Sequence, residues 1–369
     1  MINYLKKEKV LSIALILAVL SMFFVHPDAG YAEYIDLRVL ALLFCLMLLV
    51  KGFQSVGLLD WLIERLFGGI ANSRRMGQIL VGICFFSSML MTNDVALITF
   101  VPFAILTMKR CAMEKMMIRV VVLQTLAANL GSMFTPIGNP QNLYLFSVSG
   151  VSTGRFFLTM MPITVVSFVL LWLATFLLPK EEIRLDMAKR EAGESLAKPL
   201  LVVYTVLFAI NLLVVFRVIS WLPVLILTIV VMLVLRKYAL FRQVDYALLM
   251  TFVGFFVFVG NIGRVPAISQ AIGQILTGRE ILVSALFSQF LSNVPAAILL
   301  SGFTDQFEAL MLGTNIGGLG TLIASMASLI SYKEYAASSG SKKGKYLLTF
   351  TIYNVIGLVI LLLFAAFYY

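Results

Sequence analysis

The sequence predicts an all-α polytopic membrane protein, built as an inverted-topology repeat with two re-entrant hairpins and two broken helices. The first reason is composition, because 61% of the 369 residues are apolar and only 12% are charged. A soluble domain has about 45–50% apolar and about 25% charged residues. The second reason is that apolar runs recur along the whole chain. The third reason is that the two halves of the chain match each other at polar positions.

The same composition excludes a cytosolic enzyme, a nucleic-acid-binding protein and a disordered chain. Lys and Arg in cytoplasmic loops, which orient membrane helices, explain the formal net charge of +10. Three cysteines, an odd number with two in apolar runs, argue against a disulfide framework. The single histidine, His26, rules out a zinc site made of several His and leaves a Ser-His-Asp triad dependent on one loop residue. We therefore expect no enzyme, and no cofactor beyond a coupling Na⁺ or H⁺.

Nine apolar segments are expected to cross the lipid bilayer. They are residues 10–25, 35–53, 117–146, 156–178, 199–215, 219–235, 244–260, 309–332 and 346–368. A crossing of the roughly 30 Å hydrocarbon core needs about 20 residues, so several of these segments are short. Arg38 and Lys51 flank the second segment and extend it by reaching toward the interfaces. The first segment has the outline of a signal peptide, but the repeat requires it as a retained helix.

Charged loops set the orientation of these segments. Lysines before the first segment place the N-terminus in the cytoplasm, and the acidic loop 26–36 then lies outside. Segment 76–108 has basic pairs at both ends, so we expect a re-entrant hairpin that enters and leaves from the cytoplasm. Segment 280–304 is followed by acidic residues and is expected to open to the outside. The lysine-rich stretch 333–345 returns to the cytoplasm, and the C-terminus then lies outside.

The chain divides at a polar linker. Residues 1–179 are the first repeat, 180–218 the cytoplasmic linker with one odd helix, and 219–369 the second, inverted repeat. An offset of 200 aligns Ser88, Asn93, Ala96 and Ile98 with Ser288, Asn293, Ala296 and Ile298. An offset of 186 aligns Asn129, Gly131, Thr135, Ile137 and Leu143 with Asn315, Gly317, Thr321, Ile323 and Leu329. Inverted repeats with discontinuous helices are typical of secondary transporters whose site lies near the membrane midplane.

The two hairpin tips have the same polar pattern. The first tip, residues 91–94, has the sequence Met-Thr-Asn-Asp, and the second tip, residues 291–294, has Leu-Ser-Asn-Val followed by Pro295. Asn is a good N-cap, and Pro is tolerated in a first helical turn. Each tip therefore predicts a half-helix whose N-terminal N–H groups point at the middle of the membrane and favour an anion. The alternative is that these are ordinary capping residues in tight turns.

Two of the crossings, 117–146 and 309–332, are expected to be broken. Residues 129–142 contain two Pro, two Gly and three Asn, which an uninterrupted helix in lipid does not accommodate. Residues 317–320 contain three Gly, although close packing of small residues is an alternative there. The carbonyl groups of such unwound turns can coordinate a cation.

Asp94 is the only acidic residue that we expect deep in the membrane, and no Lys or Arg is expected at that depth. A carboxylate there is costly and indicates that it binds a cation or carries a proton. The alternative is a carboxylate that the start of a helix stabilises. Arg264 is expected to anchor a surface helix near the outer end. Residues 58–70 and 265–276 are expected to be interfacial amphipathic helices.

With these motifs the chain resembles the ion transporter superfamily: divalent anion/sodium symporters, arsenite permeases and sodium/proton antiporters, with their citrate-transporter-like domain. Residues 92–94 and 292–294 are similar to the Ser-Asn-Thr signature that the symporters carry at both hairpin tips. Residues 313–330 and 128–142 are similar to the broken helices of arsenite-permease-like proteins. The third signature position differs, with Asp94 in one half and Val294 in the other, and the acidic residue favours proton coupling or cation antiport.

The resemblance implies a homodimer in which the domain of hairpins and broken helices moves like an elevator. It also implies cation sites at Asn93 and Asn293, and an anion that faces the tip and broken-helix hydroxyl groups. The candidate substrate-binding residues are Thr92, Asn93, Thr135, Asn139, Ser292, Asn293 and Thr321. The candidate coupling-ion residues are Asn93, Asp94, Asn129, Gly138, Asn293, Asn315 and Gly317.

We therefore expect an inner-membrane secondary transporter that moves an anion, either a di- or tricarboxylate or an inorganic oxyanion, coupled to a sodium or proton gradient. An arsenite efflux permease and a sodium/proton antiporter are alternatives within transport. A passive channel is an alternative of another class, although it needs no intramembrane carboxylate. An aspartyl-type membrane enzyme needs a second intramembrane carboxylate, which the sequence does not place there.

Overall fold

The computed structural model describes residues 9–58, 72–111, 113–182 and 197–369, and these form helices joined by short turns. In chain order the elements are α2 (Lys9–Ser21), the 3-10 helix η1 (Ala29–Tyr34), α3 (Leu37–Ser55), α5 (Ser73–Ser87), α6 (Asn93–Arg110), α7 (Glu114–Ser132), α8 (Pro140–Val148), α9 (Thr153–Thr175), α10 (Lys198–Val215), α11 (Trp221–Val234), α12 (Tyr238–Phe241), α13 (Tyr246–Gly263), α14 (Pro266–Leu276), α15 (Glu280–Leu291), α16 (Asn293–Ser301), α17 (Phe307–Ile316), α18 (Met326–Ala337) and α19 (Lys343–Tyr368). The prediction of an all-α protein is confirmed. The helix expected at 58–70 and most of the linker 180–198 lie outside the described residues.

Five of the described helices are long and apolar enough to cross a membrane: α3, α9, α10, α13 and α19. Shorter apolar helices, among them α2 and α11 with 13 and 14 residues, reach only about 20 Å at the usual rise per residue. Large apolar side chains point outward on the long helices, for example Leu158 on α9 and Phe367 on α19, which are 66% and 91% exposed. Such surfaces suit lipid rather than water.

The two predicted hairpin segments each contain two helices joined by a short turn. In the first, α5 and α6 are separated by residues 88–92, and in the second only Ser292 separates α15 from α16. The structure places the two expected interruptions at residues 133–139, between α7 and α8, and at residues 317–325, between α17 and α18. The segment expected at 265–276 is α14. Whether the hairpins re-enter the membrane from one side stays a prediction.

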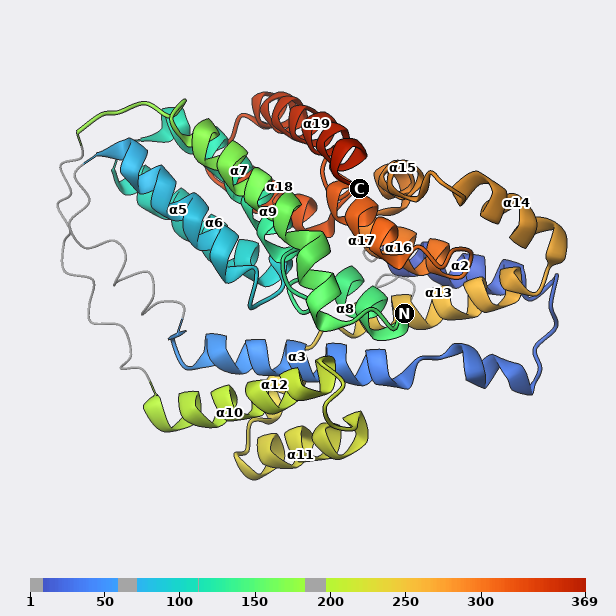
Figure 1. Ribbon diagram of the computed structural model, residues 1–369. Helices are drawn as coiled ribbons and strands as arrows, with labels where there is room; N and C mark the ends of the chain where they lie inside the picture. Colours follow the sequence, from blue (N-terminus) through green and yellow to red (C-terminus); the bar gives the residue numbers. More distant parts are fainter. Residues whose placement is uncertain (1–8, 59–71, 112, 183–196) are drawn as a thin grey trace.

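Eight of these helices, α5 to α8 and α15 to α18, are the central bundle. Within it α5 and α6 pack on α7, and α15 and α16 pack on α17. The two halves also exchange contacts, because α18 packs on α6 and α7 while α8 packs on α16 and α17. Figure 1 shows the central bundle above α3 (blue), which runs along its lower edge.

A second group of helices, α3 with α10, α11 and α12, has an apolar cluster of its own. The buried members of this cluster are Leu48, Leu49, Val56, Tyr204, Leu207, Met232, Leu240 and Val244. Helices α10 and α11 lie on the side of α3 that faces away from the central bundle (Figure 1). Helix α2 packs along α13. The candidate site lies where α3 and α13 meet the central bundle.

Candidate functional site

The first and second tips start their helices in the same way. Helix α6 begins at Asn93 and α16 at Asn293, so Thr92 and Ser292 occupy the N-cap positions and the prediction of Asn as the cap is wrong by one residue. Each Asn turns its Oδ1 back to accept the next N–H, from Asp94 at 3.0 Å and from Val294 at 2.9 Å. The side chain therefore satisfies one of the free N–H groups of the first helical turn.

Both tips are tied to the interruption in their own half. The N–H of Asn93 donates to the carbonyl of Gly138 at 3.2 Å, and the N–H of Asn293 donates to that of Ala324 at 2.9 Å. The hydroxyl of Thr135 donates to the carbonyl of Met89, and the Thr321 hydroxyl donates to that of Gln289 at 2.9 Å. The residues in each pair of bonds are separated by the same offsets of 200 and 186 that the sequence predicted. The hydroxyl groups of Thr135 and Thr321 thus donate to backbone carbonyls of the protein. The resemblance implied that these hydroxyl groups face an anion.

The glycines of the broken segments allow the close approach of neighbouring helices. A Cβ at Gly131 would lie 2.1 Å from the carbonyl oxygen of Phe85, and a Cβ at Gly317 would lie 2.7 Å from the Cα of Ala285. These two contacts are again related by the offsets 200 and 186. The carbonyl of Gly317 also accepts a hydrogen bond from the Gln289 side chain at 2.9 Å. Gly317, a candidate coupling-ion residue, therefore has a packing role in this structure.

Buried amide groups connect the two broken segments. Asn139 Nδ2 donates to Asn315 Oδ1 at 2.9 Å, and Asn315 Nδ2 donates to Asn142 Oδ1 at 2.6 Å. In the other direction, Ser325 Oγ donates to Asn129 Oδ1 at 2.9 Å, and Asn129 Nδ2 donates to a second serine, Ser328, at 3.4 Å. All six of these residues are buried, and the two sets of bonds are related by the offset of 186.

This network includes four candidate residues, because Asn93 Nδ2 also donates to Asn129 Oδ1 at 3.0 Å. The four candidates are Asn93, Asn129, Asn139 and Asn315. Sequence reasoning missed the partners Asn142, Ser325 and Ser328. The signal for these partners is the offset of 186 itself, which pairs Asn139 with Ser325 and Asn142 with Ser328 even though the paired residues differ in type.

A cavity of about 360 Å³ lies beside the first tip. Its lining includes Thr92 and Asp94 of the tip and Asn139 at the start of α8. It also includes Lys51 of α3 and Asp245, which precedes α13. The second tip borders a much smaller cavity of about 20 Å³ through Ser292 and Val294. The candidate Asn residues Asn93, Asn129, Asn293 and Asn315 are at most 5% exposed and do not line the large cavity.

Lys51 and Asp245 line the same cavity as Asp94. The sequence placed Lys51 at an interface and Asp94 as the only acidic residue deep in the membrane, and the depth of Asp94 stays a prediction. Asp245 interacts electrostatically with both Asp94 and Lys51. The predicted topology already indicated that Lys51 and Asp245 lie near the same membrane surface. The end of segment 35–53 and the start of segment 244–260 both fall on the cytoplasmic side. Among the described residues, the Asp94 carboxylate has no hydrogen-bonding or ion-pair partner.

Charged contacts close the opposite end of α8. Arg217 donates to the carbonyls of Val151, at 3.3 Å, and of Phe146, and its guanidinium lies 5.0 Å from the centroid of the Phe146 ring. Burial lowers the pKa of Arg217, and the nearby positive charge of Arg38 lowers this pKa further. Helix α8 begins at the large cavity, whereas Arg217 contacts its C-terminal part and is not among the residues that line that cavity.

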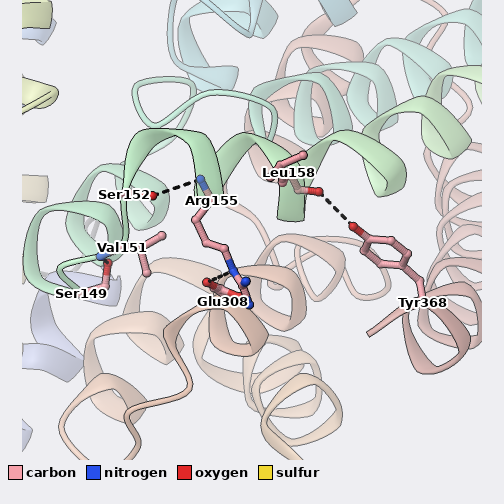
Figure 2. Close-up of polar contacts among 7 residues, drawn as sticks. All are labelled: Ser149, Val151, Ser152, Arg155, Leu158, Glu308 and Tyr368. Carbon is pink, nitrogen blue, oxygen red and sulfur yellow. Dashed lines mark hydrogen bonds and ion pairs between the residues drawn. The ribbon is translucent and has the colours of Figure 1, made fainter.

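The start of α9 is tied to α17 and α19 near the same end. Arg155 Nε forms an ion pair with Glu308 Oε1 at 2.7 Å, and the hydroxyl of Tyr368 donates to the carbonyl of Leu158 at 2.9 Å (Figure 2). Arg264, which was expected to anchor a surface helix, binds the segment before α3. Its Nη1 lies 2.8 Å from Asp28 Oδ2 and donates to the Tyr34 hydroxyl at 3.0 Å. The hydrogen bonds that Arg264 donates to Tyr34 and Asp28 raise its pKa.

Comparison with known proteins gives consistent matches over most of the chain. A protein family described as citrate transporter matches residues 5–307. An uncharacterized transporter of Methanocaldococcus jannaschii is 29% identical over 361 residues, 96% of each chain. An inner membrane protein of Escherichia coli is 31% identical over 321 residues, 85% of this chain and 84% of the relative. A silicon efflux transporter of Oryza sativa is 33% identical over 153 residues, 40% of this chain and 30% of the relative.

Proposed function

Because the chain belongs to the citrate transporter family, we propose that it is a secondary active transporter of the inner membrane. Its substrate is an anion, a di- or tricarboxylate or an inorganic oxyanion, and its driving force is a sodium or proton gradient. The single observation that carries this proposal is the large cavity, which is lined by the first tip and the start of α8 and holds Asp94, a carboxylate without a hydrogen-bonding or ion-pair partner among the described residues. A volume of about 360 Å³ suits a small ligand.

We further propose that residues 1–179 and 219–369 form an inverted repeat, with 180–218 as linker and odd helix, and that both hairpins are re-entrant. The equivalent contacts at offsets of 200 and 186 support this proposal, since unrelated segments have no reason to share them. The N-terminus is then cytoplasmic and the C-terminus outside. We propose a homodimer in which the central bundle moves against the helices around α3, as the family resemblance implies.

The contacts at the far end of α8 support a carrier over a passive channel. Arg217 and the Arg155–Glu308 ion pair hold elements together there, whereas the large cavity lies at the start of that helix. A carrier needs such closure on one side at a time. A sodium/proton antiporter is a second candidate, because two of the three charged residues that line the cavity are acidic. The silicon efflux relative keeps an efflux permease for arsenite or another oxyacid among the alternatives.

Thermal unfolding of the purified protein tests this proposal. Citrate, succinate, sulfate, phosphate and arsenite would each be added in sodium or potassium chloride at two pH values. We expect one anion to raise the unfolding temperature only with sodium or at the lower pH, because a ligand that binds the folded state stabilises it. Asp94→Asn should remove this cation requirement, and Asp305→Asn, at an exposed position outside the cavity, should leave it unchanged.

Two other outcomes would change the assignment. Stabilisation by sodium alone that depends on pH and on Asp94 would favour the sodium/proton antiporter. A lack of any anion-dependent shift in every condition would contradict transport of these anions.

A further inference from the structure

We propose that Asp245 is a second acidic residue of the transport cavity, which together with Asp94 draws a monovalent cation or proton to the first tip, while Lys51 limits the cavity to one net negative charge. This inference deepens the proposed function and rests on it for its role in coupling. It adds two residues on α3 and before α13 to a site that sequence reasoning assigned to the tips and broken helices alone.

The charged side chains that line the cavity come from three separate elements. Of its described lining residues, Lys51 alone is basic, and Asp94 and Asp245 alone are acidic. Their formal charges leave one net negative charge. The carboxylates of Asp94 and Asp245 repel each other, whereas Lys51 attracts Asp245. A cation or proton at Asp94 would cancel the net charge.

Asp245 is held in place by the helix that it caps. Its Oδ1 accepts the N–H of Leu248 at 2.9 Å, which fixes the carboxylate at the N-terminus of α13. Asp245 lines the large cavity with Asp94 of the first tip and the small cavity with Ser292 of the second tip. One carboxylate outside the central bundle therefore faces both tips, although only the first tip carries a charge of its own.

The walls between these charges are apolar, and this strengthens their effect. Leu43, Leu46, Val95, Ile98 and Leu143 are among the lining residues. A cleft with low-dielectric walls and one sign of net charge focuses the field and raises the local concentration of the opposite ion. Both carboxylates line the cavity, and Asp245 is exposed whereas Asp94 is half-buried.

A charge-sensitive labelling experiment tests this proposal on the full-length protein in detergent. Ile98→Cys places a thiol in the cavity one helical turn beyond Asp94, at a position that is 44% exposed. The natural Cys111 would be replaced by Ser, and the other two cysteines are buried. The measurement is the ratio of the labelling rates with a cationic and an anionic methanethiosulfonate reagent.

We expect Asp245→Asn to lower this ratio about threefold to tenfold, and Lys51→Met to raise it by a similar factor. Asn keeps an oxygen that can cap α13, so the helix start is retained. Asp36→Asn is the matched control, because Asp36 caps α3 through the N–H of Val39 at 3.0 Å but does not line the cavity. The control should leave the ratio unchanged.

Opposite shifts for Asp245→Asn and Lys51→Met support the proposal, because misfolding would move both variants in one direction. Equal shifts in Asp245→Asn and Asp36→Asn, or shifts of the same sign in Asp245→Asn and Lys51→Met, overturn it. The labelling ratio needs no substrate. A protein that passes this test but is not stabilised by any anion would contradict the proposed function and leave the charge assignment intact.

Discussion

The first and second tips have the same backbone anchors but different chemistry. Each tip donates an N–H to the interruption in its own half, and the helix that precedes each tip packs closely on a glycine, Gly131 or Gly317. The position after the shared Asn is Asp94 in the first tip and Val294 in the second. The first tip opens on a cavity of about 360 Å³ and the second on one of about 20 Å³. The comparison indicates that geometry holds the backbone of both tips in place, while the side chain beyond the Asn is free to differ.

The largest expected loss of stability comes from substitution of the two glycines that pack against the helices before the tips. Gly131→Ala should destabilise the protein by about 3 kcal/mol and Gly317→Ala by about 1–2 kcal/mol, because overpacking a close contact forces the backbone to move. The difference follows from the new Cβ, which would lie 2.1 Å from Phe85 O in the first case and 2.7 Å from Ala285 Cα in the second. Thermal unfolding in detergent measures both.

Gly82→Ala is the control for this pair, since a Cβ there meets nothing within 4 Å and the residue lies inside α5. It should be neutral, or stabilising by up to about 1 kcal/mol, because Ala is the better helix former. Equal destabilisation by all three variants would contradict the close-contact explanation.

Alanine substitutions in the amide network should destabilise the protein by amounts that differ less between the two halves. Asn315→Ala should cost about 2–3 kcal/mol, since it removes partners from the buried amides of Asn139 and Asn142. Asn129→Ala should cost about 1–2 kcal/mol, because two of its three partners are serine hydroxyls that can rotate to new acceptors. The unfolding temperatures of the two variants provide the comparison, and a larger loss for Asn129→Ala would show that the halves are not ordered in this way.

Glycine substitutions at the N-cap positions of the two tips should have the smallest effects on stability, and these effects should have opposite signs. Ser292 has φ 77° and ψ 156°, a conformation that suits Gly, whereas Thr92 has φ −63° and ψ 149°. Ser292→Gly should therefore stabilise the protein by about 1 kcal/mol, and Thr92→Gly should destabilise it by about 0.5–1 kcal/mol. Thermal unfolding of the two variants checks this, and shifts of the same sign would refute the conformational difference between the tips.

Local signals in the sequence located the helices closely. The expected segment 156–178 is α9, Thr153–Thr175, and 346–368 is α19, Lys343–Tyr368. The interruption at 133–139 follows from residues that cannot continue a helix: Asn139 caps α8 by accepting the N–H of Asn142 at 2.9 Å, and Pro140 occupies its first turn. Hydrophobic run length, prolines and caps act within a few residues of themselves, so a single sequence is enough to place them.

Only the tertiary structure decided which distant residues share the site. The Asn139–Asn315 and Asn129–Ser325 bonds join positions 176 and 196 residues apart. Lys51 and Asp245 belong to the cavity because α3 and the start of α13 meet the first tip there. From sequence alone, each looked like an ordinary charged residue at a helix end. Run length and capping determine where a helix starts and stops, but the packing of many apolar side chains determines which helix ends face one another, and therefore which charges act together.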